Sequence, residues 1–152
     1  VIMNKDILPQ DLPVTMIINE IAKLFHDRMR SETQKMGIPS GYRHLMFHLS
    51  REDNITQQEL VSKTHLKPPT VSVTLQNMEQ EGLVIRATGK SDSRESRVCL
   101  TEKGRKLDNA IRQKVYETEK IVLKDIVLED EKLIKPYLLK MRDNLLKEIV
   151  ES

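Results

Sequence analysis

The sequence predicts a mainly α-helical fold with one small β-hairpin. Helical periodicity, with apolar positions three and four apart, runs through most of the 152 residues. Between residues 54 and 101, two short helical segments are separated by a tight polar turn. Two strand-like segments, 83–88 and 97–101, follow directly and are joined by a polar stretch. Two helices joined by a turn, then a basic hairpin, predict a winged helix-turn-helix with long helices on either side.

A long amphipathic helix is predicted before this region. Pro13 suits the first turn of a helix, because its missing N–H costs nothing there, and Gly37 suits a helix stop. We expect this helix to run to about Met36, and a second one, capped by Ser40, to end near Arg51. The first helix has an apolar face wider than one side of a small core needs: Val14, Ile17, Ile18, Ile21, Leu24, Phe25 and Met29.

The next helix has an N-terminal signal at Thr56. Its hydroxyl can cap the first turn, while Glu59, three residues on, can reach back to the Thr56 amide. Ile55 and Leu60 match the hydrophobic staple that fixes how the chain enters such a helix. We expect this short helix to end near Lys63, with a polar turn after it.

A second short helix is predicted to begin at Pro68 and to end before Gly82, where a left-handed cap is favoured. Its apolar stripe consists of Val71, Leu75 and Met78. The opposite face has no charge and holds small or hydrogen-bonding side chains, at Pro69, Ser72, Val73, Gln76 and Gln80. A solvated face in this chain would usually carry Lys and Glu. Side chains of the observed kind suit close approach to base edges and phosphates.

Residues 56–86 resemble the helix-turn-helix of MarR-type transcriptional regulators. Residues 92–94 (Asp-Ser-Arg), followed by residues 100–104 (Leu-Thr-Glu-Lys-Gly), resemble that family's wing signature, D-x-R and then L-T-x-x-G. The resemblance implies a homodimer that binds double-stranded DNA. It also implies a small-molecule effector, often phenolic or amphipathic, held between the dimer helices and the DNA-reading lobe. Val73 stands where many members carry a basic or polar residue, so we expect apolar readout there, for instance of a thymine methyl.

DNA contacts are expected from the helix that begins at Pro68, from the hairpin and from two nearby lysines. Arg94, at the predicted hairpin tip, suits a narrow A·T minor groove, where negative potential is concentrated. Asp92 is not expected to contact DNA; as the acid of the signature, it would support the wing by holding Arg94 or Arg97 in place. The candidate DNA-binding residues are Lys63, Lys67, Pro69, Thr70, Ser72, Val73, Gln76, Asn77, Arg86, Lys90, Arg94 and Arg97.

Two further helices are predicted after the hairpin. Thr101 can cap a long one, residues 127–131 break it, and a last helix follows. Pro136 either kinks the last helix or delays its regular part. We expect a single domain, 1–152, with the DNA-binding region at 40–104. The resemblance implies that 12–37 and 105–152 form a helical dimerisation region.

Composition limits the other functional classes. The net charge is only +2, so the chain has no general affinity for polyanions, and what matters is where its basic residues are concentrated. The lone Cys99, in a strand of alternating pattern, is expected to be buried and inert, and it fits a reducing cytoplasm.

No apolar run approaches the ~18–20 residues of a membrane span and no signal-peptide pattern opens the chain, so we expect no membrane partner and a cytoplasmic location. We find no phosphate loop, nucleophile–base pair or metalloprotease motif, so we expect no enzyme and no cofactor.

Three histidines have a spacing that calls for a second interpretation. His44 and His48 are four residues apart on one predicted helix, which can grip a metal, and His26 lies on the helix before it. No cysteine pair or acidic cluster completes a set, so structural histidines are favoured and no metal site is expected. Two alternatives stay open: a metal-responsive regulator, and a helical adaptor whose winged helix contacts protein. An adaptor has no need of Arg and Lys in its hairpin, so we favour a homodimeric regulator, expected to be a repressor, on a pseudo-palindromic operator.

Overall fold

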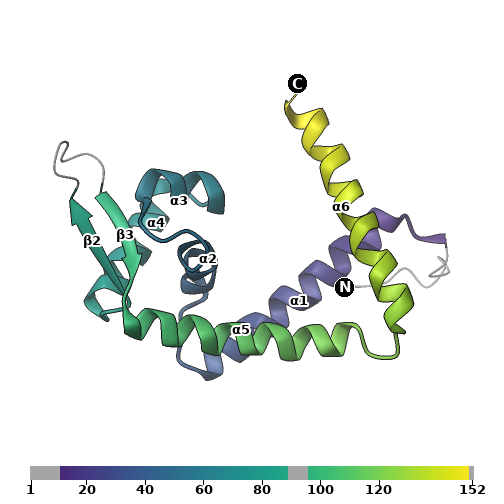
Figure 1. Ribbon diagram of the computed structural model, residues 1–152, viewed down its shortest axis with the longest axis horizontal. Helices are drawn as coiled ribbons and strands as arrows, with labels where there is room; N and C mark the ends of the chain where they lie inside the picture. The colour runs from purple at the N-terminus through teal and green to yellow at the C-terminus, as the bar shows by residue number, and fades with distance from the viewer. Residues whose placement is uncertain (1–10, 89–95, 151–152) are drawn as a thin grey trace. The chain divides into compact units, whose positions relative to one another are not determined.

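The computed structural model describes residues 11–88 and 96–150 (Figure 1). The chain divides into two compact units, Val1–Tyr116 and Glu117–Ser152. The division falls inside helix α5 (Glu102–Val122). The first unit therefore contains the predicted winged helix-turn-helix and the helix before it, and the second contains the end of α5 and all of α6 (Leu128–Val150).

Helices α1 (Val14–Lys35) and α2 (Ser40–Leu49) open the first unit. The prediction for α1 is confirmed, because Pro13 is its N-cap and Gly37 follows its end with a φ of +73°. The prediction that Ser40 caps α2 is wrong. Pro39 has the extended backbone of an N-cap and its carbonyl accepts from the Tyr42 amide at 3.0 Å, so Ser40 already lies in the first turn.

The helix-turn-helix has the predicted boundaries. Strand β1 (Ile55–Thr56) leads into α3 (Gln57–Thr64), and α4 (Pro68–Gln80) follows a short turn. The Glu59 amide donates to Oγ1 of Thr56 at 3.1 Å, and the Thr56 amide donates to Oε2 of Glu59 at 2.7 Å, so the predicted capping box is present. His65, at φ +54°, turns the chain after α3, and Gly82, at φ +72°, turns it after α4.

The two strands of the predicted hairpin are β2 (Val84–Thr88) and β3 (Ser96–Leu100), and the sheet order is β1-β3-β2 with antiparallel pairing. Strand β1, two residues long, had no signal in the sequence. In β3, Val98 and Leu100 point into the core, so alternation turns Cys99 to the outer face, where it is half-exposed. The expectation that Cys99 is buried is therefore wrong.

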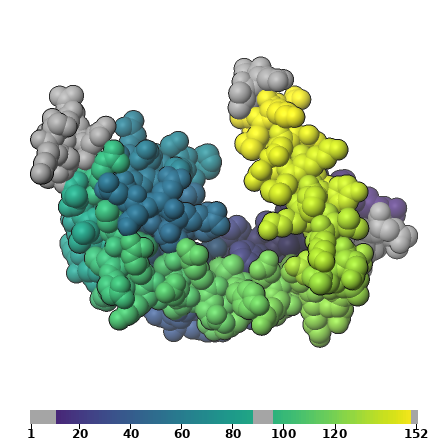
Figure 2. Space-filling view, viewed as in Figure 1, coloured from purple at the N-terminus to yellow at the C-terminus, as the bar shows by residue number. Residues whose placement is uncertain are grey.

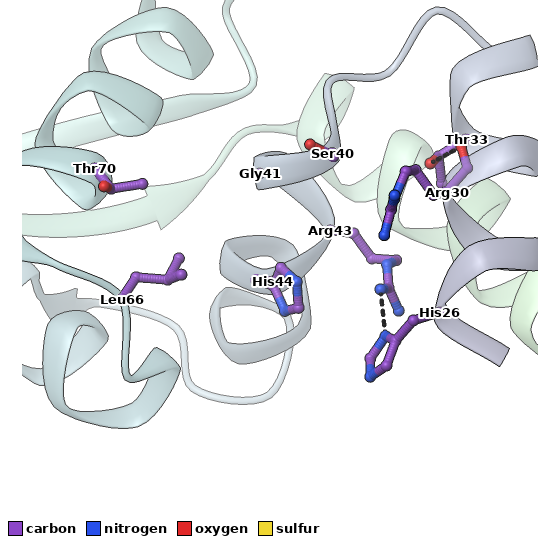
Figure 3. Close-up of a pocket in the computed structure, with 9 residues that line it drawn as sticks. All are labelled: His26, Arg30, Thr33, Ser40, Gly41, Arg43, His44, Leu66 and Thr70. Atoms are coloured by element: carbon purple, nitrogen blue, oxygen red, sulfur yellow. Dashed lines mark hydrogen bonds between the residues drawn. The ribbon is translucent and has the colours of Figure 1, made fainter. Parts of the chain in front are cut away.

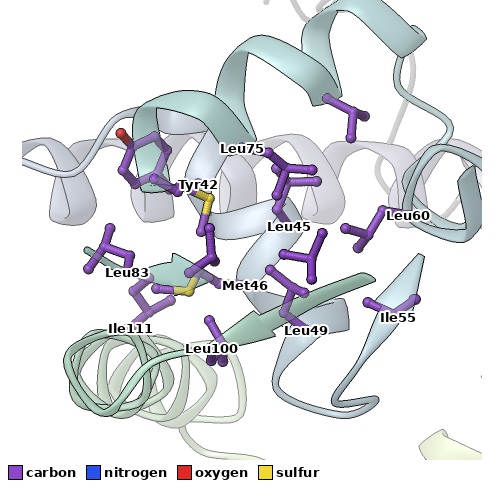
Figure 4. Packing of buried hydrophobic residues seen from close by; sticks show 14 of the residues in the cluster. Tyr42, Leu45, Met46, Leu49, Ile55, Leu60, Leu75, Leu83, Leu100 and Ile111 are labelled. Atoms are coloured by element: carbon purple, nitrogen blue, oxygen red, sulfur yellow. The ribbon is translucent and has the colours of Figure 1, made fainter. Parts of the chain in front are cut away.

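The hydrophobic core of the first unit surrounds α2 (Figure 4). Leu45, Met46 and Leu49 of α2 are fully buried. Complete burial of a side chain of this size contributes about 1.5–3 kcal/mol. The elements around α2 supply the other large members of the cluster: Ile55, Leu60, Val71, Leu75, Met78, Leu83, Val84, Val98, Leu100 and Ile111. Because they share one core, α3, α4 and the sheet are held in a fixed arrangement.

The start of α5 packs against the turn that follows α4. The Thr101 hydroxyl donates to the Gly82 carbonyl at 2.6 Å and accepts from the Gly104 amide at 3.0 Å, as expected of an N-cap. A Cβ on Gly104 would lie 2.1 Å from the Leu83 carbonyl oxygen, so a larger residue has no room there. The L-T-x-x-G motif thus has a physical reason: threonine caps α5, and glycine lets α5 approach the backbone of Leu83.

The second unit has many exposed apolar side chains. Helix α6 begins at Leu128, with three acidic residues in its first turn that suit the positive end of the helix dipole. Pro136 lies inside α6, so the alternative in which the regular helix starts later is wrong. Large apolar side chains of α6 are 39 to 72% exposed: Leu128, Leu133, Tyr137, Leu138, Leu139, Met141, Leu145, Leu146 and Ile149. Among the described residues, no helix is long and apolar enough to cross a membrane.

Candidate nucleic-acid interface

Helix α4 buries one face and exposes the opposite one. Val71, Leu75 and Met78 have no exposure to solvent. On the opposite face Val73 is 56% exposed, Ser72 is half-buried, and the remaining residues are exposed: Pro69, Gln76, Asn77 and Gln80. Within the first unit, the residues from α2 to α4 (blue to teal) pack against the strands in the space-filling view (Figure 2). The predicted base-reading side chains therefore share an uncharged, solvent-facing surface on a rigidly held helix.

The two flanks of α4 contact different elements. On one flank Thr74 donates to the Thr70 carbonyl at 2.7 Å, and a Cβ on Gly41 of α2 would lie only 3.3 Å from Oγ1 of Thr74. On the other flank Oε2 of Glu79 lies 3.4 Å from Nε of Arg86 in β2. Thr70, predicted to contact DNA, thus lies on the flank toward α2 and not at the centre of the exposed face.

The lysines near α4 have different surroundings. Lys67 is the N-cap residue of α4 and is exposed. Lys63 donates to Oε1 of Glu52 at 2.5 Å, and both side chains are substantially exposed. An exposed pair of this kind contributes little to stability, so Lys63 can exchange its partner for a phosphate at low cost.

Two of the predicted basic contacts are engaged inside the protein. Arg86 shares the inward side of β2 with Val84; besides Glu79, it reaches Oε1 of Gln57 at 3.5 Å. Its Nε is buried, and the 3.4 Å separation from Glu79 makes an ion pair without a good hydrogen bond. Arg97 donates to the carbonyl of Asn54 at 3.0 Å. The other hairpin candidates, Lys90, Asp92 and Arg94, lie outside the described residues.

The three histidines considered for a metal are placed as follows. His26 and His44 have ring centroids 6.3 Å apart, and His48 packs edge-on against Phe47. Burial lowers the pKa of His44, with a further contribution from the charge of Arg43. Burial, and then Lys63, lower the pKa of His48. Within residues 11–88 and 96–150, no three His, Cys, Asp or Glu residues are grouped as a metal site requires.

A cavity of about 660 Å³ lies between α1, α2 and the start of α4. Its wall includes His26 and Arg30 from α1, Arg43 and His44 from α2, and Leu66 and Thr70 from the second half of the helix-turn-helix. The family resemblance implied an effector site in this region, between the helices before and after the DNA-reading lobe, but no local pattern indicated its lining residues. Leu66 and Thr70 are more than 20 residues from the lining residues of α1 and α2, and only the tertiary fold brings them together (Figure 3).

The fold and the exposed face of α4 together define a winged helix-turn-helix protein, in which the second helix of the pair is the one that enters the major groove of DNA. The MarR family model matches residues 43–96. An uncharacterized HTH-type transcriptional regulator of Bacillus subtilis (strain 168), YwoH, is 30% identical over 113 residues, which are 74% of this chain and 82% of that protein. The chain belongs to the MarR family of transcriptional regulators.

Solved structures share the fold. A MarR transcriptional regulator from Methanosarcina mazei Go1 has a TM-score of 0.78 and 28% identity, covering 88% of this chain and 96% of that one. A mutant of MepR from S. aureus, bound to an oligodeoxyribonucleotide, has a TM-score of 0.60 and 24% identity, covering 88% of this chain and 99% of that one.

Proposed function

We propose that this regulator is a repressor that binds a pseudo-palindromic operator as a homodimer and releases it when a small molecule binds. The observation that carries the proposal is the uncharged, exposed face of α4, held between α2 and the hairpin. A mutant of MepR from S. aureus, which shares this fold, has been solved bound to an oligodeoxyribonucleotide, which supports DNA as the partner.

Base reading is assigned to the centre of the exposed face. Gln76 and Asn77 carry amides, which pair in a bidentate manner with N6 and N7 of adenine in the major groove. Val73 at 56% exposure offers an apolar contact for a thymine methyl. Ser72 at the edge of the face and Lys67 at the start of α4 are assigned to phosphates, which fix the register of the helix but carry no sequence information.

A second copy of this chain is the partner that best fits the second unit. Helix α6 exposes a series of large apolar side chains, and exposed apolar surface of this extent usually marks an interface. Burying it yields about 25 cal/mol per Å². Two α4 helices held in a symmetric dimer meet half-sites about one helical turn apart, so the operator reflects the symmetry of the protein.

Selection of bound DNA from a random pool tests this function. We expect an enriched pseudo-palindrome with half-sites about 10–10.5 base pairs apart. Gln76→Ala should relax base preference at one or two positions in each half-site, at a cost of about 1–3 kcal/mol. Gln34→Ala, an exposed glutamine on α1, is the matched control and should leave the selected sequence unchanged. A pool that stays unenriched would contradict sequence-specific binding.

The sign of regulation needs a separate measurement. Transcription in vitro from a promoter that overlaps the selected operator should fall when the protein is added. An increase in transcript would contradict the assignment as a repressor while leaving DNA recognition intact.

A further inference from the structure

Glu52 joins the ends of two helices, α2 and α3, each of which has a basic residue in its last turn. His48 lies in the last turn of α2 and Lys63 in the last turn of α3. The Glu52 amide donates to the His48 carbonyl at 3.0 Å, and Oε1 of Glu52 accepts from Nζ of Lys63 at 2.5 Å. We refer to His48, Glu52 and Lys63 as the helix-end cluster.

Positive charge exceeds negative charge around His48. Among the described residues, the groups whose charges act on His48 are Lys63, Glu52, Arg51 and His65, and only Glu52 is acidic. His48 is half-buried and the other four side chains are exposed, so the group faces solvent. With His48 neutral, two permanent cations already face one carboxylate. The electrostatic potential at this surface therefore favours an anion.

The helix-end cluster lies close in the chain to the start of the DNA-reading helix. His65 ends α3 in a left-handed conformation, and Lys67, two residues later, is the exposed N-cap of α4. In complexes of helix-turn-helix proteins, the first helix of the pair crosses the DNA backbone while the second reaches base edges. We therefore expect the end of α3 to lie beside a backbone phosphate when α4 occupies the major groove.

We propose that the helix-end cluster binds a phosphate of the operator backbone, for which Lys63 leaves Glu52 and His48 takes up a proton from solvent. The inference rests on the proposed function, because it adds a DNA contact to those assigned to α4. An exposed ion pair contributes little to stability, so Nζ of Lys63 can exchange a carboxylate oxygen for a phosphate oxygen at low cost. Such a contact adds affinity without reading sequence.

This exchange changes the charges that act on His48. In the free protein, burial and then the charge of Lys63 hold the pKa of His48 below its ordinary value of about 6.5. A bound phosphate neutralises Lys63, and Glu52, released from its partner, attracts a cation. The C-terminal end of α2 also stabilises a protonated histidine in its last turn. The pKa of His48 should therefore be higher in the complex than in the free protein.

A pKa that is raised on binding makes operator affinity depend on pH. The gain in affinity is complete below the pKa of His48 in the free protein, and it is lost as the pH rises through the pKa in the complex. One unit of difference between the two pKa values corresponds to about tenfold in affinity. We expect a gain of about three- to tenfold per chain between about pH 8 and about pH 5.5, at constant ionic strength.

Titration of the histidine rings by ¹H–¹⁵N NMR, with and without the selected operator, measures this shift directly. The full-length protein is used. The pKa of His48 should rise when the duplex binds, and that of His26, on α1 outside the cluster, should stay in place. Inorganic phosphate at the same ionic strength is the second probe and should produce less of the shift than the duplex. An equal shift with inorganic phosphate would assign the site to a free anion and overturn the DNA contact.

Variants of the cluster identify the groups that make the contact. Lys63→Gln should lower the slope of log affinity against log salt by about 0.9 per chain, as the loss of one phosphate contact predicts. His48→Gln should keep that slope at about pH 8 and lose the additional affinity at acidic pH. Glu52→Gln should raise affinity by about two- to fivefold per chain at neutral pH, because it removes the carboxylate that competes for Lys63.

Matched variants on α1 are the controls. Lys23→Gln, at an exposed lysine, should leave the salt slope unchanged, and His26→Gln should keep the pH dependence of the wild type. Circular dichroism and a thermal melt establish that each variant is folded. An unchanged slope in Lys63→Gln, or a pH dependence that persists in His48→Gln, would overturn the inference while leaving operator recognition by α4 intact.

A duplex with a scrambled sequence separates this inference from the proposed function. Because a phosphate contact carries no sequence information, the effects of Lys63→Gln and His48→Gln should also appear with the scrambled duplex. Both effects in a protein that selects no operator would contradict the proposed function alone. Effects confined to the selected operator would contradict a contact with the backbone.

Discussion

The hydroxyl of Tyr42 in α2 donates a 2.6 Å hydrogen bond to Oε1 of Glu81, the residue that caps the end of α4. Tyr42 is 2% exposed, so the bond lies where the core meets the surface. Tyr42→Phe keeps the ring and removes only this bond. We expect it to lower the free energy of unfolding by about 1.5–3 kcal/mol, the range for a hydrogen bond to a charged group. Urea unfolding measures the difference, and an unchanged midpoint would contradict this role.

The same pair predicts a dependence on alkaline pH. Burial, and then the neighbouring Glu81, raise the pKa of Tyr42 above its ordinary value of about 10. A raised pKa in the folded state means that unfolding favours ionisation. The contribution of Tyr42 is therefore complete below about pH 10 and declines as the pH rises further. The stability difference between the wild type and Tyr42→Phe should shrink above that pH, and a constant difference would be inconsistent with the shift.

The capping box at the start of α3 gives a prediction at acidic pH. Hydrogen bonds from the backbone and then the side chain of Thr56 lower the pKa of Glu59. Because the pKa of Glu59 is lower in the folded state than in the unfolded state, its carboxylate stabilises the fold at pH values above the ordinary pKa of Glu. This contribution is lost as the pH falls through the pKa of the folded state. Glu59→Gln can keep the geometry of the capping box without a charge, so the free energy of unfolding of this variant should depend less on pH in the acidic range. Thr56→Ala should lower the free energy of unfolding by about 0.5–2 kcal/mol at neutral pH. Urea unfolding at a series of pH values measures both effects.

Arg86 and Lys67 should respond differently to salt in operator binding. Arg86 is held by Glu79 and Gln57, whereas Lys67 is exposed at the start of α4. Lys67→Gln should reduce the slope of log affinity against log salt by about 0.9, as expected when one phosphate contact is lost. Arg86→Gln should lower the free energy of unfolding and leave that slope unchanged. A reduced slope in Arg86→Gln would place this side chain on the DNA instead.

Gly104 should tolerate no side chain. Gly104→Ala brings a methyl group to 2.1 Å from the Leu83 carbonyl oxygen, a backbone atom that cannot rotate away, and to 3.1 Å from Cδ2 of Leu100. Overpacking of this kind costs about 1–3 kcal/mol or more. Gly41→Ala, where the nearest atom is a threonine side chain at 3.3 Å, is the matched control and should cost much less. Equal melting temperatures for the two variants would contradict this explanation of the L-T-x-x-G motif.

The parts of the fold that sequence reasoning predicted are those fixed by local chemistry. The Thr56–Glu59 box, the buried stripe of α4 and the positive φ of Gly82 each depend on a few neighbouring residues. Cys99 was placed wrongly because its orientation depends on which face of β3 meets the core. Ser40 was placed wrongly because Pro39, one residue earlier, already has the N-cap backbone.

The candidate site was only partly accessible from sequence for the same reason. The exposed face of α4 follows from helical periodicity, since it lies opposite the buried stripe. The engagement of Arg86 with Glu79 and the charged cavity around Arg43 depend on tertiary contacts. No periodic pattern in one segment records such contacts. Which individual residues contact DNA stays a prediction, and the variants of Gln76, Lys67 and Arg86 described above test it.

Sedimentation of the full-length protein with a labelled duplex tests the central claim most directly. Three duplexes are compared, carrying the selected pseudo-palindrome, one half-site with the other scrambled, and both half-sites scrambled. We expect two chains on the intact site. Scrambling one half-site should cost several mismatches at about 1–3 kcal/mol each, and the fully scrambled duplex should bind at the non-specific level. One chain per duplex, or equal affinity for all three, would contradict a symmetric dimer that reads DNA through α4.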